Sequence, residues 1–292
     1  MKGRQKPWLL YALVTTVFWG FWGALTETSA YPGTIIYIIW SFTMIIPALV
    51  ALTAIKWKPE TDWKSILYGV IIGLLGAGGQ LILFTGAIAN GPAYLIFPII
   101  SLSPVVTIFL SVFFLKEKTT SKGWIGIALA LLAIPFLAYQ DPSNHLAHGI
   151  LWLIFALLVF LAWGLQAYFM RFANGRMKAE SIFFYMTITS LLLAPVAWLM
   201  TKDSAIQSLV FFWKEIGYTA AIQILNAIGA LTIVYAFRYG KAIIVSPLTN
   251  AVAPVMTVII SLILYKTMPG SVILIGMFLS VISMFILSFE DS

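Results

Sequence analysis

Apolar residues fill this chain in long runs that only short polar segments interrupt. The longest stretch without a charged residue covers 65–115. A transmembrane helix needs roughly 20 apolar residues, so a stretch of 51 residues is too long for one crossing and suffices for two. The sequence Asn-Gly-Pro at 90–92 is a turn signal in its middle. The stretch therefore predicts a helical hairpin with arms over about 65–89 and 92–115.

Reading every uncharged run in this way predicts ten membrane spans joined mostly by short loops. The spans cover about 8–28, 34–55, 65–89, 92–115, 123–140, 149–170, 181–201, 217–237, 242–264 and 270–289. A bilayer tolerates only helices and closed barrels, and barrel strands are about 10 residues of alternating polarity. Since these runs are longer and do not alternate, we expect an all-α integral membrane protein.

Composition and charge support this interpretation and give an orientation. Hydrophobic residues make up 61% of the chain and charged residues 9%, whereas soluble domains carry about 25% charged residues. Fourteen of the 17 Lys and Arg residues fall in segments that share one side of the membrane if the N-terminus is inside. This bias predicts that both termini are cytoplasmic. It also explains the net charge of +7 without a nucleic-acid partner. We interpret the first apolar run as a retained span rather than a signal peptide.

Two motifs recur in the same order in the two halves of the chain. Trp-Gly occurs at 19–20 in the first span and at 163–164 in the sixth. The fourth and ninth spans each hold two prolines, which are Pro98 and Pro104, and Pro247 and Pro254. Because five spans per half is an odd number, two similar halves must have opposite orientations in the membrane. We therefore predict two inverted five-helix repeats, over 1–140 and 141–292.

With these motifs, and with Lys116-Glu117 after the fourth span, the chain resembles the EamA-type transporters of the drug/metabolite transporter superfamily. The resemblance covers about 8–289. It implies two five-helix repeats around a central cavity and transport of small metabolites. The second half departs from the pattern, because Thr267 stands where Glu117 stands in the first half. Any role of that acidic residue is therefore not duplicated.

The sequence offers little for catalysis. No charged residue or histidine lies in the middle of a predicted span, and the chain has no cysteine. His145 and His148 share one loop and have no further metal ligands beside them. No nucleotide-binding motif occurs. We therefore expect neither enzymatic activity, nor a cofactor, nor a metal site. Glu27, at the outer end of the first span, is a candidate for a gate or a proton-coupling site, or simply a hydrated loop acid.

Uncharged polar and aromatic side chains inside the spans are the candidate ligand-binding groups. An amide in hydrocarbon is costly unless it is hydrogen-bonded, so each must face another helix or a watery cavity. The predicted substrate-binding residues are Trp19, Trp22, Gln80, Tyr94, Trp163, Gln166, Gln223, Asn226 and Asn250. Helix–helix contact and core packing are the alternatives. The four prolines at 98, 104, 247 and 254 are predicted to kink their helices.

These features lead to one functional hypothesis with alternatives. We expect a multi-pass protein of the plasma membrane, the inner membrane of a bacterium, that moves a small organic metabolite by alternating access. An amino acid, apolar or aromatic, is the first expectation for the substrate, from the resemblance together with the aromatic and amide side chains. A sugar or nucleoside transporter of the same fold and a lipid flippase are the alternatives. The expected partners are the substrate and the lipid bilayer; the sequence leaves open a homodimer, the transport direction and the coupling.

Overall fold

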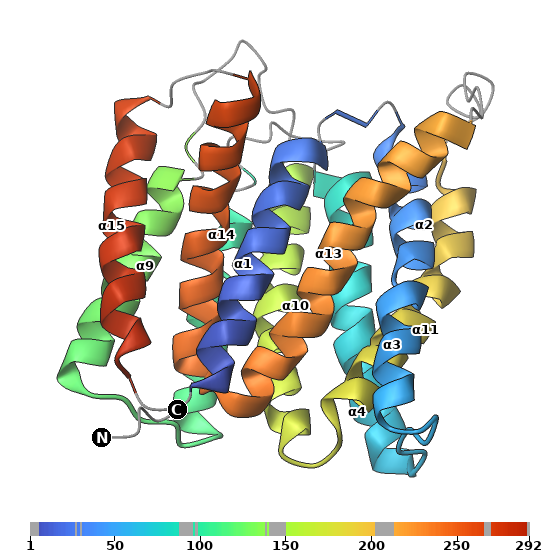
Figure 1. Cartoon of the computed structure of the whole chain (residues 1–292), viewed down its shortest axis with the longest axis horizontal. Coiled ribbons are helices and arrows are strands. Elements are labelled where there is room, and N and C mark those ends of the chain that lie inside the picture. The colour runs from blue at the N-terminus through green and yellow to red at the C-terminus, as the bar shows by residue number, and fades with distance from the viewer. Residues whose placement is uncertain are drawn as a thin grey trace.

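The computed structural model describes residues 6–26, 28–29, 31–87, 96, 99–137, 139, 150–201, 213–265 and 270–290. Helices form all the regular elements of these residues, with no β-strand among them. Figure 1 shows the helices side by side in one bundle, with the start of the first helix and the end of the last helix at the same end of the molecule. The all-α membrane architecture expected from the sequence is therefore confirmed.

The described residues of the first half form these helical elements. They are α1 (Pro7–Thr26), α2 (Gly33–Thr43), α3 (Ile45–Ala54), α4 (Trp63–Gly73), the π-helical turn η1 (Leu74–Gly78), α5 (Gly79–Ile82), the π-helical turn η2 (Leu83–Ala87), α8 (Pro104–Phe113) and α9 (Ser121–Leu137). The long helices that the structure describes in the second half follow. They are α10 (Leu151–Asn174), α11 (Ala179–Leu199), α13 (Trp213–Tyr239), α14 (Ala242–Tyr265) and α15 (Ser271–Ser288).

Eight helical segments of the described residues are long and apolar enough to cross a membrane. Among them, α2 with α3 forms one segment, and α4 through η2 forms another. Two shorter apolar helices, 99–113 and 121–137, lie where the fourth and fifth spans were predicted. The count of ten crossings and the cytoplasmic termini stay predictions.

Prolines shape the helices. Pro47 lacks the N–H that would bond to the carbonyl of Thr43, and the helix is interrupted there between α2 and α3. Pro247 and Pro254 lie inside α14 as expected. Pro104 occupies the first turn of α8, where a missing N–H costs no hydrogen bond of that helix, and the kink predicted there stays a prediction. Pro98 lies outside the described residues.

Corresponding helices of the two halves run in opposite directions. The first turn of α1 lies beside the C-terminal end of α13, where Trp8 contacts Gly240. The C-terminal end of α10 lies there too, because Arg171 bonds to the carbonyl of Phe237. The first helix of each half also packs on the third and fourth spans of the other half: α1 packs on α13 and α14, whereas α10 packs on α4 and α8. This arrangement is that of inverted repeats.

The Trp-Gly motifs explain how closely these helices approach. A Cβ atom built on Gly20 would lie 2.4 Å from the Cβ of Met256 in α14. A Cβ built on Gly164 would lie 2.5 Å from the Cβ of Val106 in α8. Only glycine therefore fits at either crossing, and small residues are what membrane helices use where their backbones meet.

A threonine completes each crossing in the same way. The Thr257 hydroxyl donates to the carbonyl of Gly20 at 3.3 Å. The Thr107 hydroxyl donates to the carbonyl of Gly164 at 3.0 Å. Each threonine also follows a proline by three residues, so the two crossings correspond in sequence as well as in contact.

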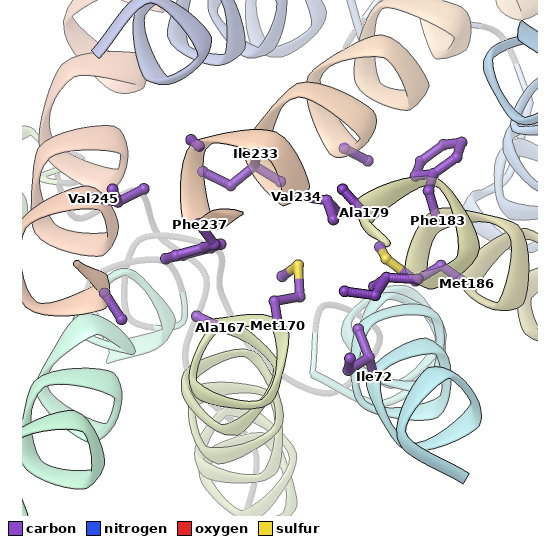
Figure 2. Close-up of a cluster of buried hydrophobic side chains, with 14 of the residues drawn as sticks. Ile72, Ala167, Met170, Ala179, Phe183, Met186, Ile233, Val234, Phe237 and Val245 are labelled. Atoms are coloured by element: carbon purple, nitrogen blue, oxygen red, sulfur yellow. The ribbon is translucent and has the colours of Figure 1, made fainter. Parts of the chain in front are cut away.

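The largest buried apolar cluster joins both repeats. Figure 2 shows Ile72 of α4, Met170 of α10 and Met186 of α11 in one region with Phe237 of α13 and Val245 of α14. All five side chains are nearly or fully inaccessible. Since these residues come from five helices of both halves, the cluster ties the repeats together.

The helix crossing at Gly20 predicts a measurable difference between two glycine substitutions. Gly20→Ala should destabilise the protein by about 1–3 kcal/mol, because its Cβ overlaps Met256 and overpacking has that cost. Gly217→Ala, in the exposed first turns of α13, has open space around its Cβ and serves as the control. Thermal unfolding in detergent should show a lower melting temperature for Gly20→Ala alone; equal melting temperatures would contradict the packing argument.

Candidate functional site

A cavity of about 540 Å³ lies between the two repeats. This volume is in the range of sites that enclose small organic ligands. Helices α1, α2, α10, α13 and α14 and the π-helical turn η1 all contribute to its wall. Its aromatic lining residues are Trp19, Trp22, Trp40, Tyr139, Trp163 and Phe237. The described residues that line the cavity include no Asp, Glu, Lys, Arg or His.

Trp19 and Trp163 occupy corresponding positions and bind the opposite repeat in the same manner. The Trp19 indole N–H donates to the carbonyl of Asn226 at 3.3 Å, and its ring fills the space over Gly229. The Trp163 indole N–H donates to the carbonyl of Gly76 at 3.4 Å, and its ring fills the space over Gly79. In each case the accepting carbonyl lies three residues before the glycine.

The third span is widened by a π-helical turn where Trp163 contacts it. The cavity residue Gly76 lies in the π-helical turn η1, and Gly79 follows that turn directly. A π-helical turn widens the helix and is frequent at functional sites. The glycines of this span thus leave room for side chains of α10, as Gly73 does for Thr189 of α11.

Two further tryptophans engage the amides of α13. The Trp22 indole N–H donates to Oε1 of Gln223 at 3.0 Å. The Trp40 indole N–H donates to Oδ1 of Asn226 at 2.8 Å. These bonds hold α1 and α2 against α13, which is the helix–helix role that the sequence left open as the alternative for an intramembrane amide. Gln223 is 2% exposed and lies outside the cavity, behind Trp22.

The remaining amides of the cavity are available to a ligand. Gln80 and Gln166 line it, and neither side chain has a hydrogen-bond partner among the described residues. A Cβ on Gly76 would lie 2.0 Å from Nε2 of Gln166, so the glycine makes the space that this amide occupies. Asn250 donates from Nδ2 to the carbonyl of Ser246 at 2.9 Å.

Proline frees one more acceptor near the cavity. Pro254 lacks an N–H, so the carbonyl of Asn250, four residues earlier, lacks the usual α-helical donor. Both residues line the cavity. Hydroxyl groups of Ser101, Ser103 and Thr249 lie in the same wall.

The structure brings most of the predicted site residues together. Those that line the cavity are Trp19, Trp22, Gln80, Trp163, Gln166, Asn226 and Asn250. Gln223 supports the wall without reaching the cavity. Tyr94 and Glu27 lie outside the described residues. No group of three potential metal-ligating side chains occurs among the residues the structure describes.

Sequence reasoning missed several lining residues. Trp40 was not among the predicted site residues, although it lies in the middle of the second span three residues after Tyr37. Met170 and Phe237 also line the cavity. Nothing distinguishes them in the sequence from the many other apolar residues of the spans.

The comparisons with known proteins agree with this architecture. The model of the EamA-like transporter family matches residues 6–139 and 150–289, which together make up most of the chain in two repeats. The chain belongs to this family. Its members are described as transporters, which accords with the cavity between the repeats.

Individual relatives are more distant. This EamA-like chain is similar to an uncharacterized protein of Methanocaldococcus jannaschii, with 33% identity over 105 residues that cover 36% of this chain and 76% of that one. It is also similar to Protein LicB of Haemophilus influenzae, with 24% identity over 205 residues, or 61% of this chain and 68% of LicB. A solved crystal structure has the same fold, with a TM-score of 0.78 over 96% of each chain at 15% identity.

The buried hydrogen bond between Trp40 and Asn226 predicts that removing its donor lowers the stability of the fold. Trp40→Phe keeps an aromatic ring but leaves Oδ1 of Asn226 without its donor, which should destabilise the protein by about 1–3 kcal/mol. Trp213→Phe, at a side chain that is 87% exposed, is the matched control. Thermal unfolding of the two purified variants measures the difference; a control that falls as far as Trp40→Phe would refute the assignment.

Proposed function

We propose that this EamA-like protein is a secondary transporter that moves a small organic metabolite across the membrane by alternating access. The observation that carries the proposal is the uncharged aromatic cavity between two inverted repeats, with unpaired amides from both halves, Gln80 and Gln166. Inverted repeats supply the two related conformations that alternating access requires, with the substrate site at their interface.

The cavity wall favours an apolar or aromatic amino acid as the substrate. Rings of Trp19 and Trp163 offer flat apolar surface for a side chain. The amides of Gln166 and Gln80 can both donate and accept, so they can bind the carboxylate and the ammonium group of a zwitterion. Since the described wall carries no charge, a ligand whose own charges cancel suits it better than an ion.

A sugar suits this wall less well. Each of its hydroxyl groups needs a partner, because a polar group buried without one costs free energy. The indole N–H groups of Trp19, Trp22, Trp40 and Trp163 already bond to the protein. Besides the amides of Gln80 and Gln166, the described wall offers the hydroxyls of Ser101 and Ser103 as further donors, which are few for the many hydroxyls of a sugar.

The proposed setting is a plasma membrane, the inner membrane in a bacterium, with ten crossings and cytoplasmic termini. The Lys and Arg distribution supports this orientation. The two shorter apolar helices, 99–113 and 121–137, lie in positions that complete five spans in the first half.

Ligand binding and transport test the function together. A ligand that binds the native state raises the melting temperature by mass action. We expect apolar and aromatic amino acids to raise it, and sugars and nucleosides to leave it unchanged. Gln166→Ala should reduce the shift and slow uptake into proteoliposomes by about tenfold, since an unpaired polar group of the ligand costs about 1–3 kcal/mol.

The control for this experiment is Thr53→Val, an exposed hydroxyl at the end of α3 that does not line the cavity. Its ligand shift and uptake should equal those of the unmodified protein. Full uptake by Gln166→Ala would place the substrate elsewhere. A rise in melting temperature with sugars alone would overturn the amino-acid assignment but would leave the proposal of a transporter intact.

The orientation has a separate test that uses the absence of native cysteine. A single cysteine placed in the 141–148 loop should react with a membrane-impermeant maleimide added to intact cells, because the proposed topology puts this loop outside. Labelling only in inverted membrane vesicles would refute the orientation.

A further inference from the structure

A buried ion pair lies where four helical segments meet at one end of the bundle. Nε of Arg171, in the last turn of α10, lies 2.8 Å from Oε1 of Glu117, which follows α8. The Glu117 side chain is 6% exposed and that of Arg171 is 29% exposed. A pair this sheltered is screened little by water, so losing one partner is costly.

Each member of the pair also binds a helix end of matching polarity. Nη1 of Arg171 donates to the carbonyls of Phe237 and Arg238, at 3.1 and 3.4 Å, in the last turn of α13. Oε2 of Glu117 accepts from the backbone N–H of Ile243, at 3.1 Å, in the first turn of α14. The cation thus meets the negative end of one helix, and the carboxylate meets the positive end of the next.

The chain turns sharply to bring the carboxylate there. Lys116 has a φ of 56°, in the left-handed region that side chains other than glycine rarely adopt. Through this turn the N–H of Glu117 bonds back to the carbonyl of Ser111 at 3.2 Å. Strained backbone of this kind persists where the surrounding structure holds it.

The pair lies next to the wall of the cavity. Met170, which precedes Arg171, lines the cavity, and so does Phe237, whose carbonyl Arg171 binds. Figure 2 shows the Met170 side chain pointing into the apolar cluster near Phe237. Any path from this end of the bundle into the cavity would part these elements.

The repeats differ at the corresponding positions. Aligning the Trp-Gly motifs pairs Arg171 with Glu27, and aligning the Pro-x-x-Thr segments of the fourth and ninth spans pairs Glu117 with Thr267. An acid and a hydroxyl group cannot form an ion pair. The ion pair between these two positions is therefore not repeated with the same residues in the other half.

We propose that Glu117 and Arg171 form an ionic latch that closes the cavity at the end of the bundle carrying the C-termini of α10 and α13. This inference rests on the proposed alternating access. The latch must open for the cavity to reach this side. The pair is formed in this structure, so the protein here is closed at the latch end.

A cavity cysteine reports the state of the latch without knowledge of the substrate. Ala167→Cys places a thiol in the cavity wall, one helical turn before Arg171, in a chain without native cysteine. A membrane-impermeant maleimide is added to intact cells and to inverted membrane vesicles. A separate variant, Arg176→Cys, carries an exposed thiol in the α10–α11 loop and identifies the preparation that presents the latch end.

In the Ala167→Cys background, Arg171→Met, Glu117→Gln and the double variant should each raise the labelling rate from the latch end by about tenfold, a factor that one charge-assisted hydrogen bond can supply. The double variant leaves no unpaired buried charge, so it keeps the test valid if a single variant folds poorly.

The matched control is Lys178→Met. Lys178 pairs with Glu60 at 3.7 Å at the same end of the bundle, but both side chains are more exposed and neither lines the cavity. It should leave labelling unchanged. Unchanged labelling in the folded double variant, even with a lower melting temperature, would make the pair merely structural and overturn the latch. That result would not contradict the transporter proposal, which the uptake assay tests separately.

Discussion

The contact between a tryptophan of one repeat and a glycine of the other sets the geometry of this protein. In hydrocarbon, helices gain little from hydrophobic attraction to one another, so close packing and hydrogen bonds must hold them together. Trp19 on Gly229 and Trp163 on Gly79 supply both, because each ring packs on bare backbone while its N–H binds a nearby carbonyl. These contacts hold the first helix of each repeat against the third helix of the other, and the cavity lies between them.

On this symmetric frame the two halves carry different chemistry. Trp22 and Gln166 each lie three residues after Trp19 and Trp163. Gly76 and Asn226 each lie three residues before the glycines on which those rings pack, Gly79 and Gly229. On one side the indole N–H groups of Trp22 and Trp40 donate to the side-chain amides of α13, which therefore serve as helix contacts. On the other side, glycine leaves space and the amide of Gln166 stays free. The duplicated fold thus keeps the same helix contacts in both halves. The residues that differ between the halves use the amides of α13 for helix packing and leave the amide of Gln166 free for a ligand.

Much of this could be predicted from the sequence, because hydrophobic runs and the repeated Trp-Gly motif are local signals. They located the helices and the two halves, and seven of the nine predicted substrate-binding residues line the cavity. Trp40 was missed, and Gln223 was assigned to the ligand, because the partner of an intramembrane polar group depends on which helix faces it. The position of Pro104 in the first turn of α8 could not be predicted, because a proline looks the same in a helix interior and in a first turn. The pairing of Arg171 with Glu117 spans 54 positions of the chain and has no local sign.

Helix α14 connects the parts that would have to move together. Its first turn binds Glu117, its middle carries two prolines and lines the cavity, and beyond Pro254 its Thr257 bonds to the carbonyl of Gly20. A helix that lacks backbone hydrogen bonds in its interior bends there at lower cost than elsewhere. Releasing its first turn while the Gly20 crossing stays packed would therefore place the bend between them, at the cavity wall. The charges of Glu117 and Arg171 lie at helix ends, where water can solvate them when the pair separates. The part of α14 that would bend lines the cavity and carries no charge.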